Sequence, residues 1–422
     1  MPSENESPNM PSTSAVIIGS TVGLAIMLAT LSMLGPFSVD AYLPAFPNIE
    51  ASLGATPLEV QQTLTAYMFA FAVMILWHGA LSDAFGRRNI ILVSLAVFAL
   101  TSIGCAAAPR VEYLWLFRVL QGMTAGAGVV IGRAIIRDLY AGAEASRLLS
   151  LVTMIFSIAP AIAPIFGGWV VKLFGWRAIF VMLFAYTLML LLYCFKYLPE
   201  SLPREQRQPF NPRSLYASYR RVFRSPLFQL KSGTIAFNFA GMFLYVAAAP
   251  VFLTRFLGLG PGQFGWQFIP LVSGIFCGAL TANRLAGRIG ISRQVTIGFA
   301  LLIGAGLFNV IYHAFFPPAL PWSVAPMFFY TFGMSMVAPA TTLLVLDLFP
   351  TTRGVAAASQ SFTQTMLAAA VAGAIAPLLS HSPFWLACGQ LACALTGLGM
   401  WLGARAYRRS MSARTTSAGN LQ

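Results

Sequence analysis

The residues GALSDAFGRRN (79–89) form a short polar stretch between two long apolar runs, at 58–81 and 89–108. Its glycines let the chain turn tightly, because glycine tolerates backbone angles that other residues avoid. Its two adjacent arginines, Arg87 and Arg88, are too costly to place in hydrocarbon. Each flanking run has about the 20 residues that a helix needs to cross a bilayer. The stretch therefore predicts two membrane-spanning helices joined by a tight, basic turn.

The rest of the chain repeats this pattern of apolar runs and short polar turns. Of the 422 residues, 58% are hydrophobic and only 9% are charged, whereas soluble domains carry about 25% charged residues. The runs long enough to span a membrane cover 20–44, 58–81, 89–108, 112–136, 146–171, 176–197, 230–254, 264–285, 294–315, 322–347, 354–379 and 384–406. We therefore predict an all-α polytopic membrane protein with about twelve transmembrane helices.

The lysines and arginines predict how the chain lies in the membrane, because basic loops stay on the cytoplasmic side. Of the 26 basic residues, 20 fall in loops or tails on one side. Four fall on the other side: Arg110, Lys172, Arg177 and Arg255. The remaining two, Arg118 and Arg133, lie inside the predicted helix 112–136. We expect a bacterial inner-membrane protein with both termini in the cytoplasm.

The chain divides around its one long loop, which is rich in proline and arginine. Asp138-Leu139-Tyr140, near the end of the fourth predicted helix, resembles Asp347-Leu348-Phe349, near the end of the tenth. Their spacing is about half the chain and favours two pseudo-symmetric six-helix halves, with chance as the alternative. The predicted parts are a cytoplasmic tail (1–19), an N-terminal half (20–198), a cytoplasmic linker (199–228), a C-terminal half (229–406) and a second cytoplasmic tail (407–422).

Several classes of protein are disfavoured by what the chain contains. The net charge of +14 is spread over loops rather than one soluble face, so no nucleic-acid partner is expected. The five cysteines lie in apolar runs and show no metal-binding spacing, and the three histidines fall in different loops or helix ends. No phosphate-binding P-loop occurs. We expect no metal, no cofactor and no enzymatic activity.

Arg118 is the most informative charge, because it lies about six residues inside the predicted helix 112–136. A charge there costs about 2.5–3.5 kcal/mol on insertion scales, so it needs a partner or water. Asp40 lies at a similar depth, roughly 7–9 Å from the same surface at 1.5 Å per residue. We expect Asp40 to be that partner and to gain and lose a proton; a purely structural ion pair is the alternative. If the first helix ends at Val39, Asp40 lies at the rim instead.

The fifth predicted helix carries a row of helix-bending and small residues. Pro160, Pro164, Gly167 and Gly168 follow the spacing i, i+4, i+7 and i+8, so they share one helical face. Prolines remove backbone hydrogen bonds, and small residues let another helix approach closely. The composition of membrane helices, in which both residues are common, is the alternative explanation.

The stretch at 79–89 resembles the signature loop of the major facilitator superfamily, G-x-L-x-D-[RK]-x-G-R-[RK]. The matching positions are Gly79, Leu81, Asp83, Gly86, Arg87 and Arg88, and the one departure is Ala84 in place of a basic residue. The resemblance implies a transporter in which Asp83 contacts the amino end of the eleventh predicted helix, near Gly354. This contact would hold the two halves together on the cytoplasmic side.

Two further stretches resemble the Bcr/CflA group of drug:proton antiporters within that superfamily. They are SVDAYLP (38–44) and RVLQG (118–122). This resemblance implies proton-driven export of small molecules, with Asp40 and Arg118 in the coupling of protons to substrate. The face of Pro160, Pro164, Gly167 and Gly168 is similar to the antiporter motif of drug exporters, although Ala163 and either Ser157 or Ala159 replace its earlier glycines.

Polar residues in the middle of predicted helices are candidates for lining a substrate cavity, or equally for bonding a neighbouring helix. They are Tyr67, Gln121, Asn238, Tyr245 and Gln364. We therefore predict a proton-coupled exporter of small, largely apolar drugs across the inner membrane, working as a monomer by alternating access. The alternative with the same fold is a proton-coupled transporter of a metabolite such as an amino acid, nucleoside or sugar. A membrane enzyme or receptor has little support, since no catalytic constellation is present.

Overall fold

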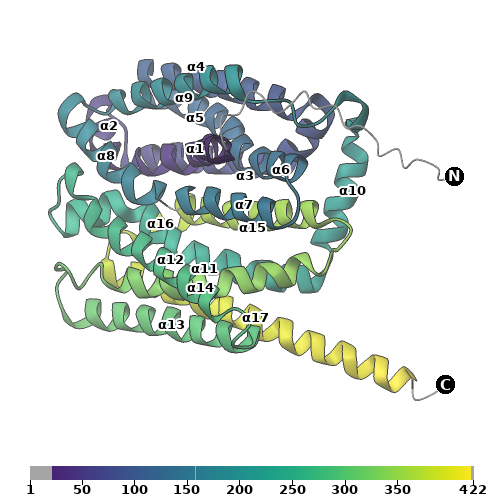
Figure 1. Ribbon diagram of the computed structural model, residues 1–422. Coiled ribbons are helices and arrows are strands. Elements are labelled where there is room, and N and C mark those ends of the chain that lie inside the picture. Colours follow the sequence, from purple (N-terminus) through teal and green to yellow (C-terminus); the bar gives the residue numbers. More distant parts are fainter. Residues whose placement is uncertain (1–20, 157, 420–422) are drawn as a thin grey trace.

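The computed structural model describes residues 21–156 and 158–419, and these residues form helices joined by turns and loops (Figure 1). Twelve helical segments in this part of the chain are long and apolar enough to cross a membrane. They are Gly23–Leu53, Pro57–Phe85, Arg87–Ala107, Val111–Leu139, Arg147–Phe174, Arg177–Tyr197, Pro226–Phe256, Pro261–Leu285, Ile291–Phe315, Ala325–Leu346, Arg353–Leu379 and Pro383–Ser410. The predicted all-α architecture is confirmed, while the predicted tail 1–19 lies outside the described residues.

Seven of these spans consist mainly of one helix. They are α3 (Pro57–Phe85), α4 (Arg87–Ala107), α9 (Arg177–Tyr197), α12 (Gly265–Leu285), α13 (Ile291–Phe315), α14 (Pro326–Leu346) and α17 (Pro383–Gly419). Their ends follow from local sequence: Thr56 caps α3 in a capping box with Glu59, and Gly86 ends it at a φ of 97°. The predicted tail 407–422 begins as a continuation of α17, since no proline or glycine separates Ala404 from Ala418.

The other spans are broken into two or three pieces. The first consists of α1 (Thr21–Asp40), the short turn η1 (Leu43–Ala45) and α2 (Phe46–Leu53). The fourth is α5 (Val111–Ala125) with α6 (Ala127–Leu139), and the fifth is α7 (Gly142–Phe156) with α8 (Ala159–Phe174). The seventh is α11 (Pro226–Val251) with the π-helix η3 (Phe252–Phe256), and the eleventh is α15 (Arg353–Ala370) with the π-helix η5 (Val371–Ile375) and α16 (Ala376–Leu379).

The predicted end of the first span at residue 44 is wrong. The helix α1 ends at Asp40, but the apolar segment continues through η1 and α2 to Leu53. Pro44 and Pro47 each lie at the start of a new helix, where proline needs no backbone partner for its nitrogen. Asp40 therefore lies within the candidate span Gly23–Leu53 rather than at its end.

The spans form two halves (Figure 1), with the first six in purple to teal above and the last six in green to yellow below. The later part of α17 extends to one side of the molecule, and α10 lies on the same side (Figure 1). We call this side, which carries the turn at Gly86 and the 198–225 linker, the basic end, and the other side the opposite end. A linker helix, α10 (Pro212–Phe223), runs across the helix ends at the basic end (Figure 1).

The two halves touch directly at the opposite end. The side chains of Gln61 and Gln62 on α3 donate hydrogen bonds of 3.1 and 2.8 Å to the carbonyl oxygens of Ala372 and Gly373 in η5. On the other flank, α8 packs against α12 and against the short turn η4 (Pro261–Gln263). These contacts join the second span to the eleventh and the fifth span to the eighth.

Candidate functional site

A fully buried arginine, Arg118, forms the centre of the N-terminal half. Its guanidinium lies between two tyrosine rings, 4.6 Å from the centroid of Tyr42 and 4.2 Å from that of Tyr67. Its side chain is 0% exposed. A cation over an aromatic face is attracted by the ring quadrupole, and burial strengthens the attraction. The two rings therefore replace much of the solvation that a buried charge loses.

Neutral polar groups complete the surroundings of this arginine. Its Nη1 donates to Gln121 Oε1 at 3.0 Å and lies 3.5 Å from the carbonyl oxygen of Ser38. Gln121 is fixed in turn, because its Nε2 donates to Ser102 Oγ at 2.8 Å. The Nε and Nη2 atoms of Arg118 have no hydrogen-bond partner among the described residues. Two donors of a buried cation thus remain available to a ligand or water.

The two tyrosines are themselves held by hydrogen bonds from neighbouring spans. Tyr67 donates to the carbonyl oxygen of Gly35 at 3.0 Å and accepts from Ser38 Oγ at 2.8 Å. The hydroxyl of Tyr42 lies 2.7 Å from that of Thr63. The rings are therefore preorganised around the guanidinium by contacts between the first and second spans.

The structure corrects the expected pairing of Asp40 with Arg118. No ion pair within the described residues joins them, although both side chains are buried, with Asp40 at 7% exposure. Asp40 is the last residue of α1, two residues beyond Ser38, whose carbonyl oxygen approaches the arginine. Equal depth in the membrane did not guarantee contact, because the rings of Tyr42 and Tyr67 occupy the positions beside the guanidinium.

The predicted face of the fifth span lies in a tight interface. Pro164, Gly167 and Gly168 are buried on α8, and Pro160 lies in its first turn. A side chain at Gly167 would meet the backbone of Ala41, and one at Gly168 would meet the carbonyl oxygen of Pro261 in the other half. Small residues are therefore required where the fifth span meets the first and the eighth. Ser157 lies outside the described residues.

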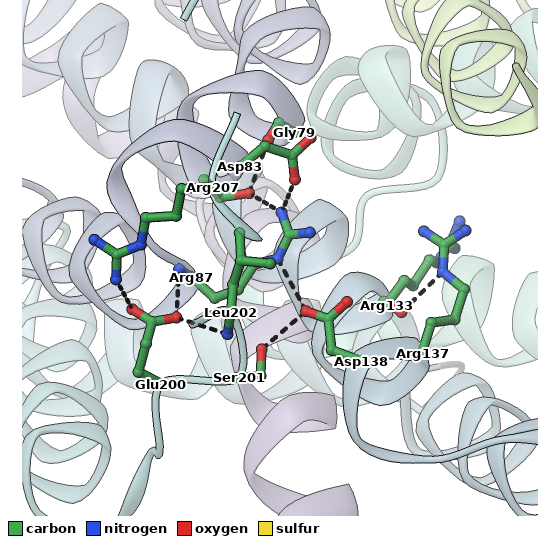
Figure 2. Close-up of polar contacts among 11 residues, drawn as sticks. Gly79, Asp83, Arg87, Arg133, Arg137, Asp138, Glu200, Ser201, Leu202 and Arg207 are labelled. Atoms are coloured by element: carbon green, nitrogen blue, oxygen red, sulfur yellow. Dashed lines mark hydrogen bonds and ion pairs between the residues drawn. The ribbon is translucent and has the colours of Figure 1, made fainter. Parts of the chain in front are cut away.

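The signature loop is organised around Arg87 (Figure 2). Arg87 is 7% exposed. Its side chain forms an ion pair with Asp83, donates to Ser82 Oγ at 2.6 Å, and its Nε lies 3.1 Å from Asp138 Oδ2. Its backbone N–H donates to Glu200 Oε1 at 2.9 Å. The loop, the end of the fourth span and the start of the linker are thus tied together by one arginine.

The linker strengthens this network. Ser201 Oγ donates to Asp138 Oδ2 at 2.9 Å, and Arg207 lies 3.3 Å from Glu200 Oε2 (Figure 2). The expected contact of Asp83 with the amino end of the eleventh span is not formed in this structure. Its carboxylate pairs with Arg87 inside the loop, and only its carbonyl oxygen contacts the linker, where it accepts from the backbone of Gln208.

Of the other signature positions, Gly86 supplies the turn, and Arg88 leaves the Arg87 network. Arg88 Nη2 donates to the carbonyl oxygen of Phe195 at 2.6 Å, and its guanidinium lies 5.5 Å from the ring centroid of that residue. Gly79 accepts from Ser82 Oγ through its carbonyl oxygen, and Leu81 is partly buried beside it. The loop therefore matches its predicted role as a folded basic turn.

The structure gathers only some of the predicted cavity residues. Tyr67 and Gln121 meet at Arg118, whereas Tyr245 accepts a 2.7 Å hydrogen bond from Asn309 inside the C-terminal half. Asn238 is buried in the same half, against Gly397 of α17. Gln364 is partly buried on α15. Tyr245 thus bonds a neighbouring helix, which was the alternative to lining a substrate cavity.

The sequence interpretation missed three residues at these contacts. Tyr42 lies two positions after Asp40 in the stretch SVDAYLP (38–44), but nothing in this spacing shows that its ring faces Arg118. Gln61 and Gln62 form an amide pair near the start of the second predicted helix. That pair could have predicted a contact between helices, since buried amides in membrane helices normally form hydrogen bonds to another helix.

Comparison with known proteins places this architecture in a family. The Major Facilitator Superfamily matches residues 22–373. A bicyclomycin resistance protein homolog of Haemophilus influenzae is 30% identical over 292 residues, which are 69% of this chain and 73% of the relative. Multidrug resistance protein D of Escherichia coli is 27% identical over 347 residues, 80% of this chain and 84% of the relative.

A solved structure agrees in fold. The human organic anion transporter MFSD10 superimposes with a TM-score of 0.67 at 19% identity, covering 90% of this chain and 97% of that one. Twelve candidate spans together with the family match define a multi-pass membrane transporter. The chain belongs to the Major Facilitator Superfamily, and its named relatives confirm the predicted resemblance to the Bcr/CflA group.

Proposed function

We propose that this chain exports small, largely apolar drugs across the bacterial inner membrane in exchange for protons. The observation that carries the proposal is Arg118, a buried cation with two free donors and no carboxylate partner among the described residues. Intramembrane charges are expensive and are usually functional. The names of the bicyclomycin and multidrug resistance relatives support drugs as the substrate class.

Asp40 supplies the proton site in this proposal. It is a carboxyl group inside a span, has no hydrogen bond or ion pair within the described part of the chain, and remains 7% exposed. An ionised carboxylate is costly in such a place, whereas the protonated acid is not. Proton binding therefore favours the closed arrangement of the opposite end, and proton loss favours its opening.

Substrate would compete for the same region, because Ser38 and Tyr42 flank Asp40 and contact Arg118. The aromatic rings of Tyr42 and Tyr67 provide surfaces for flat apolar molecules, and the free arginine donors would bind a carbonyl or hydroxyl group. The basic end lies in the cytoplasm in this proposal, with both termini, as the distribution of arginines favours. One copy of the chain contains the whole site, so a monomer suffices.

Drug susceptibility tests this proposal directly. We would express the wild type and Asp40→Asn in an efflux-deficient bacterium, across a panel of chloramphenicol-like compounds and lipophilic cations. The wild type is expected to raise resistance, while Asp40→Asn is not, at equal membrane levels. Glu50→Gln is the matched control, since Glu50 is a partly buried carboxyl group of the same span.

Transport by proteoliposomes under an imposed pH gradient separates coupling from resistance. Asp40→Asn that still moves substrate against its gradient when driven by protons would refute the role of Asp40. A wild type that protects against no compound in the panel refutes the drug substrate class, and a metabolite screen in the same vesicles then identifies the cargo.

A further inference from the structure

The linker helix α10 has two faces of opposite character. Asn211 caps its start, since its side-chain oxygen accepts from the backbone of Arg213 and Ser214 at 3.1 Å each. The side chains that recur at helical spacing on one face are buried or partly buried; they are Leu215, Ser218, Tyr219, Val222 and Phe223. The opposite face is exposed and basic. This pattern is typical of a helix lying at a membrane surface.

The inner face of α10 contacts both halves of the transporter. Tyr219 donates a 2.7 Å hydrogen bond to the carbonyl oxygen of Leu76 on α3, in the N-terminal half. Burial raises the pKa of Tyr219 to about 12, so the hydroxyl remains a donor at physiological pH. The ring of Phe223 packs on Phe228 and Phe362 in the C-terminal half, with centroids 5.6 and 5.8 Å apart. The helix is therefore a strap between the halves.

The contact with Leu76 places α10 at the basic end of the second span. Leu76 lies nine residues before Phe85, the last residue of α3, which corresponds to about 14 Å along the helix axis at 1.5 Å per residue. The hydroxyl of Tyr219 therefore reaches this last part of α3, while α10 itself runs across the helix ends (Figure 1). With the basic end in the cytoplasm, as proposed above, the outer face of α10 lies at the cytoplasmic membrane surface.

The outer face has positive charges that the protein does not neutralise. Its exposed residues include Arg213, Arg220, Arg221 and Arg224, and none of these has an ion pair in the described part of the chain. Tyr216, 70% exposed, lies among them. Asp347 is the single acidic residue after Glu205, and it pairs with Arg353. The described residues therefore offer these arginines no carboxylate partner, and their charges are open to an anionic partner outside the protein.

We propose that the outer face of α10 binds the anionic phospholipid headgroups of the cytoplasmic leaflet. Charge complementarity, the location at the basic end and an exposed tyrosine, which prefers the membrane interface, all favour lipid as the partner. Because the inner face joins both halves, lipid bound to the strap stabilises the arrangement seen here. The inference rests on the proposed orientation, with the basic end in the cytoplasm, but not on drug export.

Hydrogen–deuterium exchange of the full-length protein in nanodiscs tests the proposal. Exchange across residues 212–224 is compared in phosphatidylglycerol and in phosphatidylcholine. We expect exchange to be about tenfold slower in the anionic lipid, and the difference to disappear at high salt, which screens exposed charges. Equal exchange in the two lipids would overturn the proposal. This readout needs no substrate, so it stands apart from any failure of the drug assay.

Variants identify the charges responsible. Arg220→Gln, Arg221→Gln and Arg224→Gln together are expected to abolish the lipid difference, whereas lysine at all three positions preserves it. Unchanged exchange of the glutamine variant in phosphatidylcholine shows that its helix is still folded. The matched control removes three exposed arginines around the turn between the eighth and ninth spans: Arg284 at the end of α12, Arg288 in the turn and Arg293 at the start of α13. A control variant that also loses the difference would contradict a specific role for α10.

Discussion

The side-chain amide of Gln62 donates a 2.8 Å hydrogen bond to the carbonyl oxygen of Gly373, which joins the second span to the eleventh. The acceptor lies in a π-helix, where the wider turn disturbs the usual backbone pairing and leaves carbonyl groups for other partners. Gln61 repeats the contact with Ala372 at 3.1 Å. The opposite end of the transporter is therefore closed partly by two side-chain amides from one half that bind backbone carbonyls of the other.

Replacing both Gln61 and Gln62 with alanine should open the opposite end. Each lost hydrogen bond is worth about 0.5–1.5 kcal/mol, and about 1.4 kcal/mol is a tenfold change in population. We therefore expect the open population to rise by roughly 5- to 150-fold, measured by spin-label distances across the opposite end. Gln294→Ala is the control, since Gln294 makes the same type of bond to Met336 within one half. A distance distribution identical to that of the wild type would exclude this clamp.

Gly168→Ala should hinder closure on the other flank. The added methyl group would meet the carbonyl oxygen of Pro261, and backbone cannot move aside as a flexible side chain can. Overpacking of this kind costs about 1–3 kcal/mol. We expect transport in proteoliposomes to fall at least about fivefold, with the open population raised as in the glutamine variant. Gly304→Ala, at a position with nothing within 4 Å, should be neutral. Equal transport by both variants would contradict the packing argument.

The ring of Tyr42 should matter more than its hydroxyl. Tyr42→Phe loses the bond to Thr63, worth about 0.5–1.5 kcal/mol, but keeps a ring beside Arg118. Tyr42→Leu also loses the cation–π contact, about 2 kcal/mol for a desolvated pair. Thermal unfolding in detergent should therefore rank wild type, phenylalanine and leucine in that order, and substrate transport should follow the same order. Phenylalanine and leucine variants of equal stability would show that the ring is dispensable.

Glu200→Gln should loosen the linker. Glu200 accepts from the backbone of Arg87 and pairs with Arg207, and its side chain is 26% exposed. Losing its charge removes a partly screened ion pair and weakens a charge-assisted bond, together about 1–2 kcal/mol. We expect trypsin to cleave the linker several-fold faster. Glu205→Gln, at an exposed position of the same linker, is the control. Unchanged cleavage after Glu200→Gln would mean that other contacts hold the linker.

The sequence alone determined the twelve spans and the basic turn at Gly86. Each crossing of the hydrocarbon needs a run of about 20 mostly apolar residues, so the number of crossings can be counted from the local sequence. The same logic singled out Arg118, because an arginine in an apolar run is conspicuous wherever it lies in the fold. The small-residue face at Gly167 and Gly168 could also be predicted from the sequence, since helical periodicity is a local property.

Only the tertiary structure decided which groups meet. Depth along a helix suggested that Asp40 pairs with Arg118, but depth does not fix the rotation of one helix against another, and two tyrosine rings occupy the positions beside the guanidinium. The bond from the backbone of Gln208 to Asp83 and the bond from Gln62 to Gly373 likewise join residues distant in sequence. The apolar character that places a segment in the membrane belongs to its own residues. Which side chains contact one another depends on how the helices pack.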